Sequence, residues 1–239
     1  MPTFASCTAC NLGFHWVCLA IWESARFLAN SQARWHGSYC GAPLSREFYA
    51  RPAPVVAQEC IGKILVLETE DGPMSGRIVE TEAYLGIHDK AAHSYGGRRT
   101  PRNDVMYGPP GHAYVFLIYG LHHHLNLVTN ASGDPCAVLV RAVEPLSGQD
   151  RMRQRRPVEQ LTALTSGPGK LCQAFGIDRG VNGHDLCCSP LFLVDGPAPA
   201  RVVRTPRIGI DYAGDWARRR LRFVDPDSRF LSRLRSGLR

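Results

Sequence analysis

The chain has 239 residues, 44% hydrophobic and 21% charged, a composition typical of globular proteins that excludes a disordered, collagenous or disulfide-scaffold protein. Lys and Arg outnumber Asp and Glu by 28 to 21, and residues 201–239 alone hold 11 Arg against four Asp. This basic end indicates a polyanionic partner, nucleic acid before an acidic membrane surface, or else only a solvated face.

The cysteines and the apolar segments indicate a location for the protein. The number of cysteines, nine, is odd, and Cys187 and Cys188 are adjacent, which does not fit a secreted disulfide framework. No apolar run approaches the roughly 18 residues of a membrane span, and no basic residue precedes the first apolar stretch as in a secretory signal. We therefore expect an intracellular protein in a reducing compartment, with no contact with a membrane.

Residues 1–44 contain few charges and four of the cysteines, and we expect a poorly ordered extension of unknown role. Its Cys7-x-x-Cys10 pair has no second pair at zinc-ribbon or zinc-finger spacing, so we expect no metal there. The alternative is a zinc protein built on Cys7, Cys10, Cys18 and Cys40, which predicts stoichiometric zinc that is lost on truncation at residue 44.

From residue 45 the pattern predicts dense secondary structure. In chain order it predicts a helix over 45–60, strands over 61–68 and 77–84, a long loop over 94–111, hairpin strands over 112–119 and 121–129, a strand over 137–143, helices over 146–156 and 166–175, and short strands centred on Phe192, Val202 and Phe223. Hairpin-linked strands with segregated helices indicate an α+β fold. We expect one mixed domain over 45–232, with a largely antiparallel curved sheet, surrounding helices and a protruding β-hairpin, and then a basic tail over 233–239.

Two carboxylates and a phenol alternate along the second strand. Glu80, Glu82 and Tyr84 project from one face, because alternate side chains of a strand point the same way. Such a row is energetically unfavourable in a strand unless it lines a cleft. In a cleft, a carboxylate beside an aromatic ring can serve as a general base. The alternative is a solvated edge strand with two harmless glutamates.

The loop and the hairpin that follow carry residues suited to nucleic acid. Arg98, Arg99 and Arg102 can contact phosphates, or they can form only a solubilising face. Tyr119 lies at the hairpin turn, where a rigidly held ring can insert between stacked bases; the alternative is that it packs back on its own sheet. The neighbouring His122-His123-His124 run is only a weak indication of metal binding. The nearby His93 is, taken alone, more often structural than functional.

Several motifs together resemble the alkyladenine (3-methyladenine) DNA glycosylase family. The sequence has no P-loop, no dinucleotide-binding Gly-x-Gly-x-x-Gly and no nucleophile elbow. The resemblance covers about residues 45–232 and none of 1–44. The motifs that carry it are GRIVETEAYLG (76–86), AAHS (91–94), TPRN (100–103), YVFLIYG (114–120), SGPGKLCQ (166–173), PRIGI (206–210) and GDWA (214–217).

The resemblance implies a role for each matching residue. Glu82 matches the general base that activates water, and Arg141 matches the arginine that helps to hold that water. Tyr84, His93, Phe116 and Asn126 match the pocket for the flipped base. In this pocket Asn126 crowds the 2-amino group of guanine. Phe116 departs from the tyrosine of the best-known vertebrate members, so stacking is retained but a phenolic hydrogen bond is lost.

The remaining roles concern the DNA. Tyr119 matches the intercalating tyrosine. We expect Arg98, Arg99, Arg102 and Lys170 to contact the DNA backbone, with further phosphate contacts from the arginines between 201 and 222.

The function that the resemblance implies is base excision repair. The enzyme would flip alkylated or deaminated purines (the 3-methyladenine, 7-methylguanine, hypoxanthine and etheno-adenine class) out of duplex DNA and hydrolyse the N-glycosidic bond with a water molecule activated by glutamate. No lysine is placed as a Schiff-base nucleophile, so we expect a monofunctional enzyme. The resemblance implies no cofactor or metal, and we expect a monomer, since binding one lesion requires only one copy of the chain. The alternative is a non-catalytic nucleic-acid-binding module of similar fold.

Overall fold

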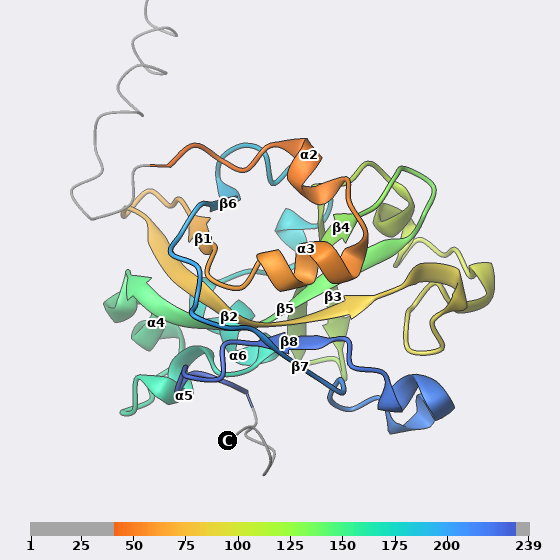
Figure 1. The fold of residues 1–239 in the computed structure, drawn as a ribbon. Helices are drawn as coiled ribbons and strands as arrows, with labels where there is room; N and C mark the ends of the chain where they lie inside the picture. The colour runs from red at the N-terminus through yellow and green to blue at the C-terminus, as the bar shows by residue number, and fades with distance from the viewer. Residues whose placement is uncertain (1–40, 233–239) are drawn as a thin grey trace, which may run out of the picture. The chain divides into compact units, whose positions relative to one another are not determined.

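The computed structural model describes residues 41–232, whose centre is an antiparallel sheet (Figure 1). The strands run in the order β3-β4-β5-β2-β1-β6, and β8 pairs with both β2 and β7. They are β1 (Ile64–Leu67), β2 (Met74–Tyr84), β3 (Ala113–Ile118), β4 (His122–Thr129), β5 (Cys136–Ser147), β6 (Leu191–Val194), β7 (Val203–Thr205) and β8 (Arg222–Val224). The single mixed α+β domain and the largely antiparallel sheet predicted from the sequence are confirmed.

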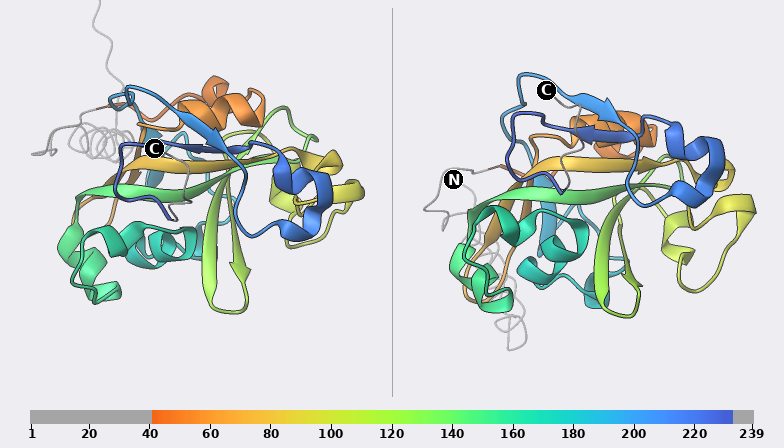
Figure 2. Two further views of the ribbon diagram at one scale, coloured as in Figure 1. Left: turned by 60° about the horizontal axis from the view of Figure 1, so that its bottom comes forward. Right: turned by 90° about the horizontal axis from the view of Figure 1, so that it is seen from below.

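Short helices cover both faces of the sheet. They are α2 (Arg46–Tyr49), α3 (Ala53–Glu59), α4 (Gln149–Arg155), α5 (Thr162–Thr165) and α6 (Pro168–Phe175). In Figure 2 (left), α2 and α3 lie on one side of the sheet, and α4, α5 and α6 lie on the other, toward which the hairpin of β3 and β4 projects. The segment between β2 and β3, which includes the predicted long loop, contains single 3-10 turns at Gly86–His88, Tyr95–Gly97 and Asp104–Tyr107.

Two predicted helices have different bounds in the structure. The helix expected over 45–60 is divided into α2 and α3, because Pro52 lacks an N–H group and disfavours helical backbone at the residue before it. The helix expected over 146–156 starts only at Gln149. Leu146 and Ser147 instead complete β5, and Gly148 (φ 73°) makes the turn between the two elements.

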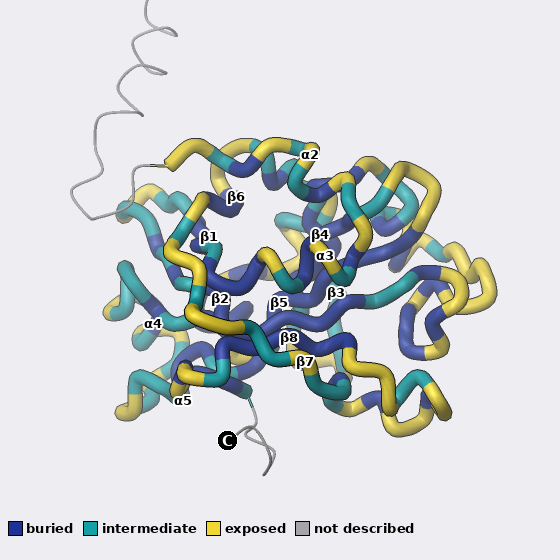
Figure 3. The backbone as a smooth tube through the Cα atoms, viewed as in Figure 1, coloured by how far each residue is buried: buried dark blue, intermediate teal, exposed yellow. Residues whose placement is uncertain are grey.

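The carboxylate strand β2 lies inside the sheet. It pairs with β5 along one edge and with β1 and β8 along the other, and Figure 3 shows it as one of the most deeply buried segments. Glu80 and Glu82 are both fully buried. The alternative of a solvated edge strand is therefore wrong.

The pairing register aligns the residues of one surface. Tyr114 of β3 pairs with Asn126 of β4, Asn126 pairs with Leu139 of β5, and Leu139 pairs with Glu82 of β2. One row of residues thus crosses four strands. The β2–β5 register also shifts around Glu80, and Arg141 of β5 stands outside the regular pairs. Such bulges re-aim a side chain, and here the guanidinium of Arg141 turns toward the two glutamates.

Candidate active site

A cavity of about 130 Å³ opens over this row. Successive strands contribute alternate residues to its wall, as expected when one face of each strand lines a cleft. These residues are Tyr114, Phe116 and Ile118 from β3, His124 and Asn126 from β4, and Leu139 and Arg141 from β5. Tyr84, His93 and the segment 208–212 contribute the rest of the polar and aromatic lining.

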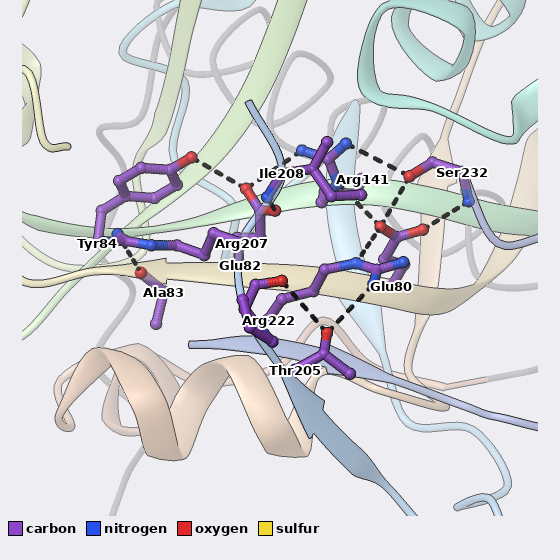
Figure 4. Close-up of polar contacts among 11 residues, drawn as sticks. Glu80, Glu82, Ala83, Tyr84, Arg141, Thr205, Arg207, Ile208, Arg222 and Ser232 are labelled. Carbon is purple, nitrogen blue, oxygen red and sulfur yellow. Dashed lines mark hydrogen bonds and ion pairs between the residues drawn. The ribbon is translucent and has the colours of Figure 1, made fainter. Parts of the chain in front are cut away.

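Glu82 lies directly behind the cavity wall. Its Oε2 accepts hydrogen bonds from the Tyr84 hydroxyl at 2.9 Å and from Arg141 Nη1 at 3.2 Å, and its Oε1 accepts one from the Ile208 N–H at 2.8 Å. All three donors line the cavity, and Figure 4 shows them around the carboxylate. Burial, and next the charge of Glu82, raise the pKa of Tyr84 well above its usual value. The tyrosine therefore stays protonated.

Glu80 forms the centre of a second, more strongly charged cluster. Its Oε1 accepts hydrogen bonds from Arg141 Nε at 2.9 Å and Arg222 Nε at 2.7 Å, and its Oε2 accepts one from the Ser232 N–H at 2.7 Å. Burial alone would favour the protonated acid, but the two arginines outweigh it and lower the pKa of Glu80. Arg141 is therefore held from two sides, by Glu80 and by Glu82 (Figure 4).

Aromatic rings form a further part of the cavity lining. The rings of His93 and Phe116 meet edge to face at 4.5 Å, and Tyr114 lies 5.3 Å from Phe116. His93 Nδ1 and the Tyr114 hydroxyl are 2.8 Å apart and share a hydrogen bond. The ring of Tyr84, another lining residue, lies 4.7 Å from the guanidinium of Arg207. Flat rings in the lining of a cavity can stack on a planar heterocycle.

Both histidines of the cavity are neutral at physiological pH. Desolvation, with the charges of Arg102 and Arg98, lowers the pKa of His93 to about 4. Desolvation and the charge of Arg141 lower the pKa of His124 to about 4 as well. Neither ring repels a cationic ligand, and each has one N–H donor and one acceptor nitrogen.

The hairpin of β3 and β4 presents an exposed aromatic ring at its tip. Tyr119 is 87% exposed and adopts a positive φ of 51°, and Leu121 is 77% exposed. The alternative that Tyr119 packs back on its own sheet is wrong. The hairpin is supported on both sides: Arg102 donates to the Leu117 carbonyl at 3.0 Å, and Gly169 of α6 packs against His122.

The basic residues divide into exposed and buried groups. Arg98, Arg99, Arg102 and Lys170 are exposed, as contact with a DNA backbone requires. By contrast, the arginines of the basic end are not all available. Arg207 is fully buried and holds Asp89 through two hydrogen bonds, and Arg222 is buried against Glu80. The expectation that all the arginines between 201 and 222 contact phosphates is therefore wrong for these two.

Sequence reasoning missed several cavity residues. The Ile208 N–H and Tyr212 come from a segment far from β2 in sequence. Ile208 lies in the PRIGI motif, but that motif was given no role in the pocket, and no motif includes Tyr212. His124 was considered only as a metal ligand, yet its alternation with Asn126 on β4 is the signal that could have placed it in the wall. In the part of the chain that the structure describes, no group of three or more His, Cys, Asp or Glu side chains could hold a metal ion. Cys7, Cys10, Cys18 and Cys40 lie outside the described residues.

The structure thus combines a mixed α+β fold, a buried carboxylate behind a cavity and an exposed aromatic ring at a hairpin tip, and comparison with known proteins assigns the chain to a family. Residues 47–229 match the family model described as "Methylpurine-DNA glycosylase (MPG)". A protein of Desulfitobacterium hafniense is 50% identical over 198 residues, covering 79% of this chain and 98% of that protein. One of Methanocella arvoryzae is 50% identical over 196 residues, covering 81% and 98%. Both are named "Putative 3-methyladenine DNA glycosylase".

The chain therefore belongs to the methylpurine-DNA glycosylase family, and it is an enzyme of the DNA glycosylase class, a hydrolase of N-glycosidic bonds. The family resemblance predicted from the sequence motifs is confirmed. None of the helices between residues 41 and 232 is long and apolar enough to cross a membrane.

Proposed function

We propose that the protein removes alkylated and deaminated purines from duplex DNA in base excision repair. The substrates are the 3-methyladenine, 7-methylguanine, hypoxanthine and etheno-adenine class, and the product is an abasic site. The observation that carries this proposal is the fully buried Glu82, whose three hydrogen-bond donors all line the cavity. A non-catalytic binding module does not require a buried carboxylate hydrogen-bonded to the lining of a cavity.

Extrusion of the damaged nucleotide precedes the chemistry. A base inside a duplex is out of reach, and flipping it costs about a few kcal/mol, least for a lesion that pairs poorly. Tyr119, exposed at the tip of a braced hairpin, fills the gap that the base leaves. The extruded purine then stacks between Tyr84 on one wall and His93 with Phe116 on the other. Asn126, on the cavity wall, crowds the 2-amino group of guanine.

Hydrolysis uses Glu82 as the general base. A water molecule held by Glu82 and Arg141 attacks C1′ of the deoxyribose, and the Glu82 carboxylate accepts its proton. The C1′–N bond breaks, and its electron pair leaves with the purine. A base alkylated at N3 or N7 departs neutral, whereas hypoxanthine departs as an anion that needs stabilisation. A cationic base also gains about 0.5–2 kcal/mol over the aromatic walls.

The proposed enzyme is monofunctional, acts inside the cell as a monomer on double-stranded DNA, and needs no cofactor or metal. A Schiff-base mechanism that nicks the strand requires an amine in the site. The described lining of the cavity contains no lysine, which supports hydrolysis by water alone.

Single-turnover base release tests this function. The substrates are duplexes with one hypoxanthine or one etheno-adenine, and methylated DNA, each followed by alkali to reveal abasic sites. We expect release by the wild-type chain with no nick before alkali, and a loss of about 100-fold or more in Glu82→Gln, since general bases contribute about 10²–10⁴-fold.

Two controls separate catalysis from binding. Glu159→Gln changes an exposed glutamate in the same way and leaves release unchanged. Tyr119→Ala weakens extrusion while Glu82 stays in place. If the wild type binds DNA but releases no purine from any of the three substrates, the protein is a binding module and the proposed function is wrong.

A further inference from the structure

His124 is a cavity residue to which the proposed reaction gives no role. It lies on β4 opposite Phe116 of β3, and the two rings are 5.4 Å apart at an angle of 60°. Arg141, on the next strand, lies near enough for its charge to act on the imidazole. His124 thus stands between an aromatic wall of the cavity and the arginine that contacts Glu82.

Within residues 41–232 the ring nitrogens of His124 form no hydrogen bond with the protein. The other histidine of the cavity differs in this respect, because His93 Nδ1 and the Tyr114 hydroxyl share a hydrogen bond at 2.8 Å. Neither nitrogen is among the fully buried side-chain atoms that lack a partner, so each can reach the cavity or the solvent. Such a group in a cavity wall is suited to a ligand.

The position of His124 selects the part of a ligand that it can reach. Arg141 and Glu82 are in contact at 3.2 Å, and in the proposed reaction they hold the attacking water, so the attacked C1′ lies beside them. His124 is next to Arg141, so it faces the edge of the purine nearest the glycosidic bond. On that edge the ring nitrogen N3 is a hydrogen-bond acceptor in hypoxanthine and in 7-methylguanine. In 3-methyladenine a methyl group occupies N3.

We propose that His124 determines lesion specificity by donating a ring N–H hydrogen bond to N3 of the extruded purine. This inference rests on the proposed function. As the C1′–N bond breaks, an uncharged purine gains negative charge over its ring nitrogens, and the donor stabilises that charge. Hypoxanthine therefore depends on His124 most, 7-methylguanine less, since it leaves neutral, and 3-methyladenine least.

The test compares single-turnover release rates of the three lesions in the full chain. His124→Phe keeps the ring and removes both nitrogens. We expect it to slow hypoxanthine release about 10- to 100-fold, the effect of one hydrogen bond to a charged group, and 3-methyladenine release less than threefold. His124→Gln and His124→Asn restore a donor at the position of either nitrogen, and one of them should recover much of the hypoxanthine rate. His123→Phe, one residue away on the same strand, is the matched control.

The outcomes distinguish this inference from the function on which it rests. Suppose that the wild type releases purines and that His124→Phe slows the release of all three lesions equally, or of none. His124 then does not recognise N3, and the proposed glycosylase function is unaffected. If the wild type releases nothing, the proposed function itself fails. His124→Ala, which cannot overfill the wall, serves where His124→Phe unfolds, with folding checked by urea denaturation.

Discussion

Glu80 and Glu82 are two residues apart on one strand, yet their surroundings prepare them for different tasks. Glu80 accepts hydrogen bonds from two guanidinium groups and a backbone N–H. Its negative charge is therefore neutralised by groups of the protein itself. Glu82 accepts a hydrogen bond from only one guanidinium, at the longer distance of 3.2 Å. Its other two donors are uncharged: the Tyr84 hydroxyl and the Ile208 N–H. Glu80 is therefore a positioning residue for Arg141, and Glu82 remains the carboxylate suited to proton transfer.

Replacing Glu80 should cost far more stability than replacing an exposed glutamate. Glu80→Gln leaves Arg141 and Arg222 buried with one negative charge too few, which costs about 3–5 kcal/mol. Glu144→Gln breaks the half-exposed pair with Arg77 (2.6 Å) and costs about 1 kcal/mol or less. Urea denaturation at pH 7 measures both, and equal losses would contradict the buried-pair argument.

The same carboxylate gives stability a pH dependence of known sign. The pKa of Glu80 is lowered in the folded protein, so the unfolded chain binds the proton first as the pH falls. Its contribution is therefore complete above the ordinary glutamate pKa and is lost as the pH falls through the lowered one. Above pH 6 this group causes no change in stability.

At the scale of elements, the N-terminus of α3 is capped by a residue that is far away in sequence. Pro52 precedes the helix and offers no capping side chain, so the Ala53 N–H donates instead to Asn130 Oδ1 at 3.0 Å. Asn130 follows β4 and adopts a positive φ of 65°, which asparagine tolerates better than most residues. One side chain thus joins the end of the hairpin to the helix layer.

Asn130→Ala should therefore lower stability for two reasons. It removes the cap, which costs about 1 kcal/mol, and it places an ordinary residue at positive φ, which costs about 1–2 kcal/mol more. Asn130→Gly loses the cap but accepts the backbone conformation. The expected order of thermal midpoints is wild type, then Asn130→Gly, then Asn130→Ala; if the two variants melt together, the backbone term is absent.

The elements also show what the sequence can predict. The hairpin, β2 and the shared face of Glu82 and Tyr84 follow from local alternation, so they were predictable. The hydrogen bond from the Ile208 N–H to Glu82 spans 126 residues, and that from the Ser232 N–H to Glu80 spans 152. These contacts depend on how the segment between β7 and β8, and the segment after β8, close over the sheet, which no local pattern specifies.

At the scale of the whole molecule, the distribution of charge differs from what composition suggests. The basic end of the chain places Arg207 and Arg222 in buried ion pairs, and Arg204 reaches Gln58 of α3, on the face away from the hairpin. Exposed cations also come from other parts of the chain: Arg98 from the long loop, and Lys170 from α6, whose Gly169 packs against His122 of the hairpin.

The salt dependence of DNA binding should follow this distribution and not the count of arginines. Each phosphate contact releases counterions and steepens the plot of log K against log salt by about 0.9. Arg98→Gln and Lys170→Gln, made in the inactive Glu82→Gln protein, should each reduce the slope by about that amount. Arg204→Gln removes the same charge from the opposite face and should leave the slope unchanged. Fluorescence anisotropy with a lesion-containing duplex measures all three, and an equal reduction in Arg204→Gln would mean that the DNA does not lie along the hairpin face.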